Sequence, residues 1–146
     1  MTSLLLLLFT VVAGAFLPMQ AGVNARLAQF VGGPVRASMV SFGVGALALF
    51  LVVVLFYRSE THRVSAAPWW AWVGGLLGAF YVTSTVVVPV RIGAAAFFGI
   101  LVAAQLVTSV VLDRFGAIGF PKHDLSPGRL IGVAMLIAGA VLVRVF

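Results

Sequence analysis

The sequence lacks cysteine and is poor in charge. It has no Cys, only three Asp and Glu, and 8% charged residues overall, whereas a soluble domain carries about a quarter. Without cysteine the chain has no disulfides, thiolate nucleophiles or zinc ribbons. Hydrophobic residues make up 63% of its 146 residues. A domain this small leaves much of its surface in contact with solvent, so we infer that its solvent is a lipid bilayer.

The net charge of +6 does not indicate a nucleic-acid partner. Nine Lys and Arg residues stand singly between long apolar runs, and they form no stripe that would follow a phosphate backbone. Isolated basic residues at the ends of apolar segments are typical of anchors at the level of lipid headgroups. Membrane lipids are therefore the expected surroundings, and no nucleic acid is expected.

Five apolar stretches are long enough to span a bilayer, which takes about 20 residues. The fold class is therefore an all-α membrane protein with one transmembrane domain. Its expected helices are 3–25, 35–57, 69–90, 93–113 and 127–146. The first stretch is an alternative candidate for a signal peptide, but it lacks a basic leading region and a small-residue cleavage site before Pro18.

Prolines and tryptophans mark several helix starts. Ser126 followed by Pro127 is typical of an N-cap and a first helical residue. Pro68 precedes a group of tryptophans suited to the membrane interface, Trp69, Trp70 and Trp72. The very short turn at residues 89–93 predicts that the third and fourth helices are adjacent and antiparallel.

The basic residues barely distinguish the two sides of the membrane. One side is expected to hold Arg58, Arg63, Arg114, Lys122 and Arg129, and the other Arg26, Arg36, Arg91 and Arg144. The positive-inside rule needs an asymmetry, and five against four supplies almost none. Our hypothesis is dual topology, in which the chain inserts both ways and pairs as an antiparallel homodimer. A single fixed orientation is the alternative.

Polar residues at membrane depth are candidate sites because they are costly unless paired or hydrated. Gln20 and Asn24 lie four residues apart on one face of the first helix. Pro18 should kink or break this helix and leave a carbonyl free near its middle. A broken helix beside two amides suits a substrate site at the midplane. Alternatively, the amides bond only to neighbouring helices.

The fourth helix carries Gln105, Ser109 and Asp113 at the same four-residue spacing. They form one polar stripe, and we expect Gln105 and Ser109 to face substrate. Asp113 lies at the helix end beside Arg114, which favours an interfacial aspartate that is ion-paired or solvated. Proton coupling through Asp113 is the alternative.

Arg26 and Tyr81 are weaker candidates for substrate contact. Arg26 is expected to extend toward the headgroups, and the alternative is that it draws an anionic or zwitterionic substrate into a vestibule. Tyr81 adds a hydroxyl on the third helix. Small residues of the last helix favour close packing, which we expect at a dimer seam; they are Gly128, Gly132 and Gly139.

No arrangement of residues supports catalysis. There is no Ser/His/Asp set, phosphate loop or metal-ligand spacing, and His62 and His123 fall in aqueous loops. We therefore expect no enzyme activity, no metal and no cofactor.

Motifs in most segments resemble the YdcZ-like transporters, a five-helix bacterial and archaeal branch of the drug/metabolite transporter superfamily. The motif residues are Gly14, Pro18, Gln20, Asn24 and Leu27; Ser41-Phe42-x-x-Gly45; Trp70 with Gly74-Gly75-x-x-Gly78; Pro89-x-Arg91-x-Gly93; Gln105 to Asp113-x-Phe115-Gly116; and Arg129-x-x-Gly132. Ala104 and Arg114 depart from the family's usual glycine and frequent histidine. The resemblance implies two inverted five-helix units, ten helices in all, around a central pathway in the bacterial inner membrane.

The sequence thus predicts a homodimeric secondary transporter that moves a small polar or amphipathic molecule by alternating access. The expected substrate-facing residues are Gln20, Asn24, Gln105, Ser109, Tyr81 and Arg26. The competing class is a non-transporting membrane protein, either a lipid-handling dimer or an accessory subunit. A lipid-handling protein would need a polar groove open sideways to the bilayer, which sequence does not reveal.

Overall fold

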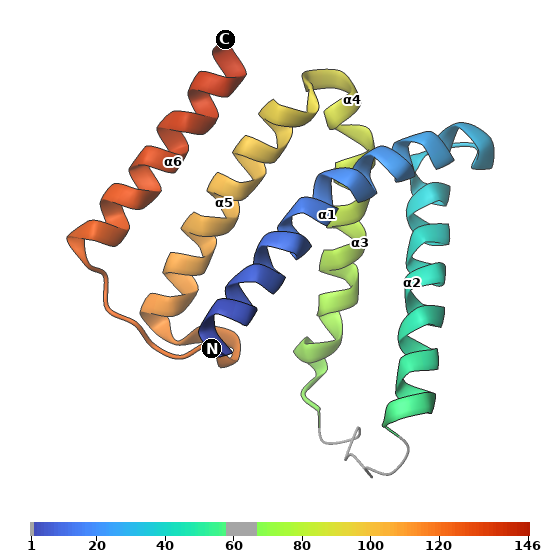
Figure 1. The fold of residues 1–146 in the computed structure, drawn as a ribbon, viewed down its shortest axis with the longest axis horizontal. Helices are drawn as coiled ribbons and strands as arrows, with labels where there is room; N and C mark the ends of the chain where they lie inside the picture. The colour runs from blue at the N-terminus through green and yellow to red at the C-terminus, as the bar shows by residue number, and fades with distance from the viewer. Residues whose placement is uncertain (1, 58–66) are drawn as a thin grey trace. The chain divides into compact units, whose positions relative to one another are not determined.

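The computed structural model describes residues 2–57 and 67–146. Over these residues the chain is helical apart from turns and loops (Figure 1). The elements are α1 (Thr2–Val31), α2 (Pro34–Phe56), η2 (Trp69–Val73), α3 (Gly74–Val87), α4 (Pro89–Ile92), α5 (Ala94–Phe115), η3 (Ala117–Gly119) and α6 (Pro127–Val145). The loop expected to carry Arg58, His62 and Arg63 lies outside the described residues.

The prediction of an all-α protein with five spans is confirmed. Among the described residues, five stretches are long and apolar enough to cross a membrane: Leu4–Val31, Pro34–Phe56, Trp69–Ile92, Ala94–Phe115 and Pro127–Val145. The first span extends well beyond residue 25, where the sequence placed its end. The chain divides into two compact units, Met1–Val87 and Val88–Phe146, which we call unit 1 and unit 2.

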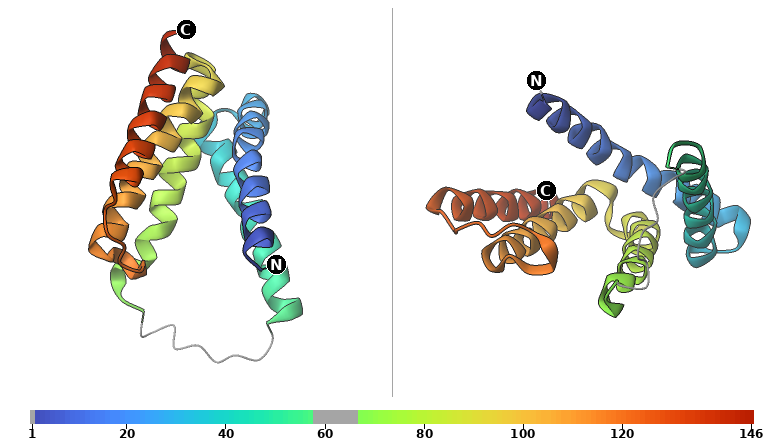
Figure 2. Two further views of the ribbon diagram at one scale, coloured as in Figure 1. Left: turned by 60° about the vertical axis from the view of Figure 1, so that its left-hand side comes forward. Right: turned by 90° about the horizontal axis from the view of Figure 1, so that it is seen from below.

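Unit 1 contains α1, α2 and α3, and each of these helices contacts the other two. α1 and α2 are joined by Gly32 and Gly33, whose φ angles are 85° and 129°. The Gly33 N–H donates to the Ala28 carbonyl oxygen at 2.9 Å, the longer bond of a Schellman turn. Only glycine adopts these positive φ values without strain. This turn brings α2 back along α1, and α3 runs antiparallel to α2 (Figures 1 and 2).

Of the kink or break predicted at Pro18, the break is wrong, because α1 runs without interruption from Thr2 to Val31 with Pro18 inside it. Proline has no N–H, so the Gly14 carbonyl still lacks the bond that residue 18 would otherwise donate. A bilayer favours keeping the remaining helical bonds, because an unpaired backbone group there costs several kcal/mol. The helix therefore tolerates one missing bond and does not unwind.

Unit 2 contains α4, α5 and α6, and the antiparallel α5 and α6 lie side by side (Figures 1 and 2). They approach closely at Gly99, where an added Cβ would lie 3.5 Å from the Ala140 Cα. Gly116 ends α5 in the left-handed conformation, with φ 61°. At the start of α6 the Ser126 hydroxyl accepts from the Arg129 N–H at 3.3 Å, which confirms the predicted N-cap.

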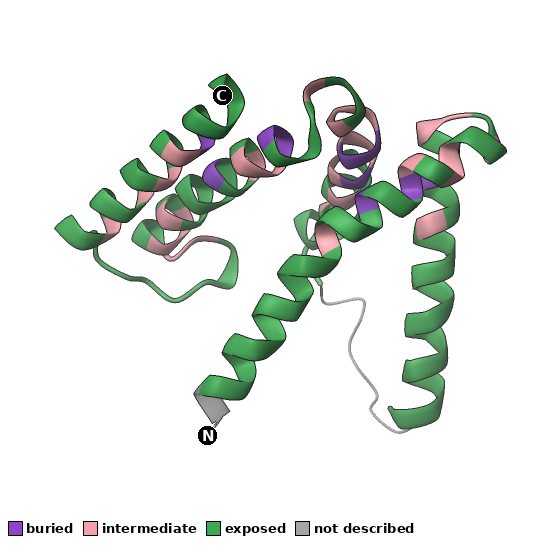
Figure 3. Cartoon of the chain, turned by 45° about the horizontal axis from the view of Figure 1, so that its top comes forward, coloured by how far each residue is buried: buried purple, intermediate pink, exposed green. Residues whose placement is uncertain are grey.

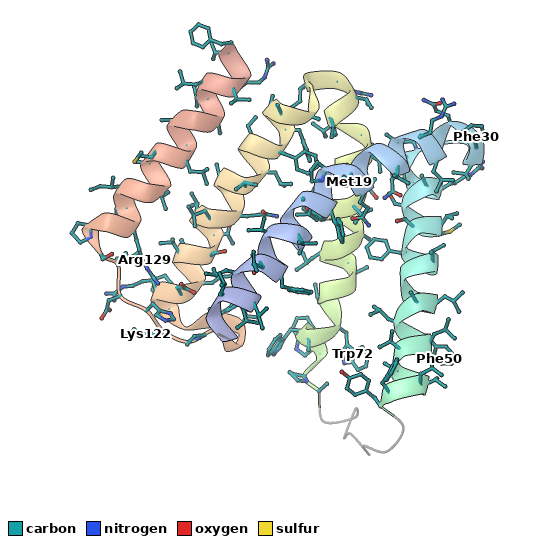
Figure 4. The ribbon with its side chains drawn as sticks, viewed as in Figure 1. Met19, Phe30, Phe50, Trp72, Lys122 and Arg129 are labelled. Atoms are coloured by element: carbon teal, nitrogen blue, oxygen red, sulfur yellow. The ribbon has the colours of Figure 1, made fainter. Side chains whose placement is uncertain are left out.

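Most apolar side chains of the described residues point outward (Figure 3). Met19, Phe30 and Phe50, labelled in Figure 4, are 64%, 73% and 62% exposed. Such a surface is stable only where lipid tails or apolar partner helices cover it.

Candidate functional site

A groove of about 300 Å³ lies within unit 1, between α1, α2 and α3. It is lined by Gln20, Ser41, Phe42, Gly45, Ala46, Leu49 and Val82. Phe42 forms one wall and packs against α3, where its Cζ would lie 3.4 Å from a Cβ on Gly78. The lining is apolar except for the Gln20 amide and the Ser41 hydroxyl. A groove of this kind suits a molecule with an apolar body and few polar groups.

Asn24 lies one turn beyond Gln20 on α1 and is only 3% exposed. Its Nδ2 atom is buried and has no hydrogen-bond partner among the described residues. The other buried polar side chains are satisfied by their own helices: Ser38 donates to Pro34 O at 3.0 Å and Thr85 to Val82 O at 2.7 Å. Since buried donors are nearly always paired, the Asn24 amide is an exception that needs an explanation.

Tyr81, on α3, also has a buried polar atom without a hydrogen-bond partner among the described residues. Its side chain is part-buried, and its hydroxyl is fully enclosed without a hydrogen-bond partner in the described chain. Ser84 donates to the Tyr81 carbonyl oxygen at 2.7 Å, so this serine is occupied by its own helix, as expected of a helical hydroxyl. Tyr81 therefore brings a second unpaired buried donor to unit 1.

Arg26 is engaged close to its own position on α1. Its guanidinium donates to the Gln29 side-chain oxygen and stacks over the Phe30 ring, 5.1 Å from the centroid. Phe30 lies at the end of α1, next to the turn into α2 (Figure 4). This arrangement favours an anchor at the membrane interface over a group that faces the groove.

A second groove, of about 290 Å³, lies within unit 2 between α5 and α6. Ser109 and Asp113 of the predicted polar stripe line it, together with Leu106, Val110, Arg129, Gly132 and Val133. Gln105, the third member of the stripe, is exposed and is not among these lining residues. Two of the three stripe residues, Ser109 and Asp113, therefore line the groove next to α6, and Gln105 does not.

Asp113 is ion-paired, but its partner is not the adjacent Arg114. The Arg129 Nη1 atom lies 3.4 Å from the Asp113 Oδ2 atom, and the His123 Nδ1 atom lies 3.9 Å from the same oxygen. Arg114 instead pairs with Asp124 at 2.6 Å. The Asp113 side chain is 28% exposed, so its charge is balanced in a partly dry position. The packing of α6 against α5 therefore determines the ion-pair partner of Asp113, and the position of Arg114 next to it in the sequence did not indicate this partner.

Several residues that line the two grooves were not predicted to be site residues. Ser41, Phe42 and Gly45 line the groove of unit 1, and Arg129 and Gly132 line that of unit 2. Each belongs to a motif shared with the YdcZ-like transporters, and none was predicted to be a site residue. The predicted site residues divide in the same way: Gln20, Asn24, Arg26 and Tyr81 belong to unit 1, and Gln105, Ser109 and Asp113 belong to unit 2.

Over the described residues, five spans long and apolar enough to cross a bilayer define an integral membrane protein. The chain belongs to the YdcZ family, because residues 5–142 match the family described as "Putative inner membrane exporter, YdcZ". It is 32% identical over 146 residues to "Inner membrane protein YdcZ" of Escherichia coli (strain K12), covering 98% of this chain and 97% of that protein. No solved structure matches. The chain is therefore a multi-pass inner membrane protein of an exporter family, which is not a class of enzyme.

Proposed function

We propose that the protein exports a small polar or amphipathic molecule, and that it works as an antiparallel homodimer by alternating access. The observation that carries the proposal is the buried, unpaired Asn24 Nδ2, one turn from a glutamine that lines a groove. An unpaired buried donor costs about 1–3 kcal/mol. A substrate acceptor that reaches it recovers this energy, so the resting site is prepared to bind.

The lining of the unit 1 groove supports the choice of substrate class. Gln20 and Ser41 are its polar members, and neither carries a charge. A strongly charged molecule would lose its hydration there without gaining a counter-ion. A substrate with an apolar body and one or two hydrogen-bonding groups fits the chemistry of the groove. Tyr81 adds a further enclosed donor on α3.

The homodimer is supported by the surface and by the charge count. Long apolar faces point outward on most helices, and inverted pairing of two five-helix chains would cover part of them. The near balance of basic residues allows both orientations to insert. In this proposal Gln105, exposed on α5, faces the central pathway from each protomer. Asp113 is an acidic group that lines a groove, and proton coupling through it requires a state in which Arg129 moves away.

The test is a thermal-shift screen of the purified protein in detergent against a library of metabolites and drugs, because a ligand that binds only the folded state raises the unfolding temperature. Each hit is then followed into proteoliposomes. Asn24→Ala and Gln105→Ala should abolish transport while expression and dimerisation are retained. Gln29→Ala is the matched control, since Gln29 is an exposed amide on α1 that pairs with Arg26.

Two results would overturn the proposal. If phospholipids stabilise the protein and no soluble compound does, the lipid-handling alternative replaces it. If Asn24→Ala and Gln105→Ala lose the folded dimer instead of transport, both residues are structural and the site is elsewhere.

A further inference from the structure

A further groove lies on a face of the α5–α6 pair, next to the groove that Ser109 and Asp113 line. Its volume is about 410 Å³, within the range of about 300–1,000 Å³ common for small-molecule sites. It is lined by Val107, Val110, Val111, Arg114, Phe115, Leu125, Leu130 and Val133. Arg114 is its one charged member. We call it the Arg114 groove.

The Arg114 groove runs from the membrane interface toward the hydrocarbon. Arg114 stands in the last turn of α5, which ends at Phe115. Val107 lies seven residues earlier, about 10 Å deeper at 1.5 Å per residue. The groove is open, since Val111 and Leu130 are 50% and 53% exposed. In a bilayer such a surface faces acyl chains, with a cationic side chain at headgroup level above them.

The headgroup end of the groove presents both signs of charge. The Arg114 Nη1 atom lies 2.6 Å from the Asp124 Oδ1 atom, and these side chains are 45% and 88% exposed. This pair can be opened at little cost, because exposed ion pairs are weak. The neighbouring Asp113–Arg129 pair differs, with side chains only 28% and 38% exposed. Lys122 and Arg129 mark this end of the helix pair in Figure 4.

We propose that the Arg114 groove binds one phospholipid with a primary-ammonium headgroup. Its phosphate accepts from the Arg114 guanidinium, its ammonium donates to the Asp124 carboxylate, and an acyl chain lies along Val107 and Val111. Guanidinium suits phosphate because its planar donors form paired hydrogen bonds. An anionic lipid gains the same phosphate contact but meets the negative charge of Asp124 without a compensating cation. A choline lipid carries the cation but has no N–H to donate.

Native mass spectrometry of the full-length protein tests this with phosphatidylethanolamine, phosphatidylglycerol and phosphatidylcholine in competition. The wild type should retain phosphatidylethanolamine over each of the others by about fivefold, the upper end of what an exposed ion pair contributes. Asp124→Asn should remove this preference and favour phosphatidylglycerol, because the repelling carboxylate is gone. Arg114→Gln should weaken retention of all three lipids. Arg91→Gln, at an exposed arginine on α4, is the control and should retain the wild-type preference.

A matched pair of variants tests the contact between the groove and the acyl chain. Val111→Trp fills the groove and should reduce lipid retention, whereas Val102→Trp on the same helix should not. Val102 is similarly exposed, at 43%, and is absent from the lining. Equal retention of the three lipids by the wild type, or a preference that Asp124→Asn leaves intact, would overturn the proposal. These variants lie outside the unit 1 groove, so this result is independent of the substrate screen.

Discussion

Arg129 reaches back sixteen residues along the chain to Asp113, with 3.4 Å between its Nη1 atom and the Asp113 Oδ2 atom. The contact joins the first turn of α6 to the last turn of α5, and it closes the loop between them. The His123 backbone N–H donates to the Asp113 carbonyl oxygen at 2.8 Å, so the loop is held by the same residue. Asp113 is therefore a structural junction as well as a member of the second groove.

A double-mutant cycle on Asp113→Asn and Arg129→Gln should give a coupling energy of about 0.5–1 kcal/mol, because the pair is partly buried and shared by two helices. Thermal unfolding in detergent measures it. The control cycle on Arg114→Gln and Asp124→Asn breaks a more exposed pair and should give a smaller coupling. Equal coupling in the two cycles would contradict a special structural role for Asp113.

Replacing Asn24 separates a structural from a functional role. Asn24→Leu keeps the number and branching of the side-chain heavy atoms and removes the unpaired Nδ2, so we expect unchanged or slightly higher stability. Transport should nevertheless be lost. Ser38→Ala is the matched control at a buried polar residue whose hydroxyl bonds to its own helix, and it should retain transport. A clear loss of stability in Asn24→Leu would show that the amide supports the fold.

The sequence predicted the fold well because the bilayer acts on local features. Apolar runs of about 20 residues and the Ser126 cap are each visible without knowledge of tertiary structure. Of the two outcomes predicted at Pro18, the break does not occur, because unpaired backbone groups are costly in lipid. α1 continues past Arg26 to Val31, and it ends there because Gly32 and Gly33 adopt positive φ angles.

The grooves were only partly predictable, because they depend on which helix faces meet. A four-residue spacing identified Ser109 and Asp113 as one stripe, but it could not indicate that Arg129 lies opposite them. Ser41 gave no periodic polar signal on α2, so only the motif resemblance singled it out. The lack of a partner for the Asn24 amide is a property of tertiary packing, and no local pattern contains it.

Two glycines distinguish packing inside the protein from packing between copies. Gly99→Leu should destabilise the protein by about 1–3 kcal/mol, because the new side chain meets the Ala140 backbone, which cannot move aside. Gly99→Ala should be tolerated, since its Cβ meets Ala140 at an ordinary contact distance. An added Cβ at Gly139 has nothing within 4 Å, and Gly139 does not line the groove between α5 and α6, so Gly139→Leu should leave the monomer unaffected. If α6 forms the dimer seam, Gly139→Leu should release monomers in size-exclusion chromatography with light scattering, and an intact dimer would place the seam elsewhere.

The orientation of the chain can be measured directly, because the sequence contains no cysteine and an engineered thiol has no background. Val90→Cys and Pro121→Cys introduce exposed thiols at opposite ends of α5 without changing the charge count. If both orientations insert, a membrane-impermeant maleimide applied to intact cells should label about half of each variant.

The control for this assay is a chain with a deliberate charge bias. Replacing Arg91 and Arg144 with Gln leaves five basic residues on one side of the membrane and two on the other. By the positive-inside rule this chain should insert mainly one way, so that one thiol is labelled and the other is protected. If the unbiased chain already shows that all-or-none pattern, it has a fixed orientation, and an antiparallel homodimer in the membrane is ruled out.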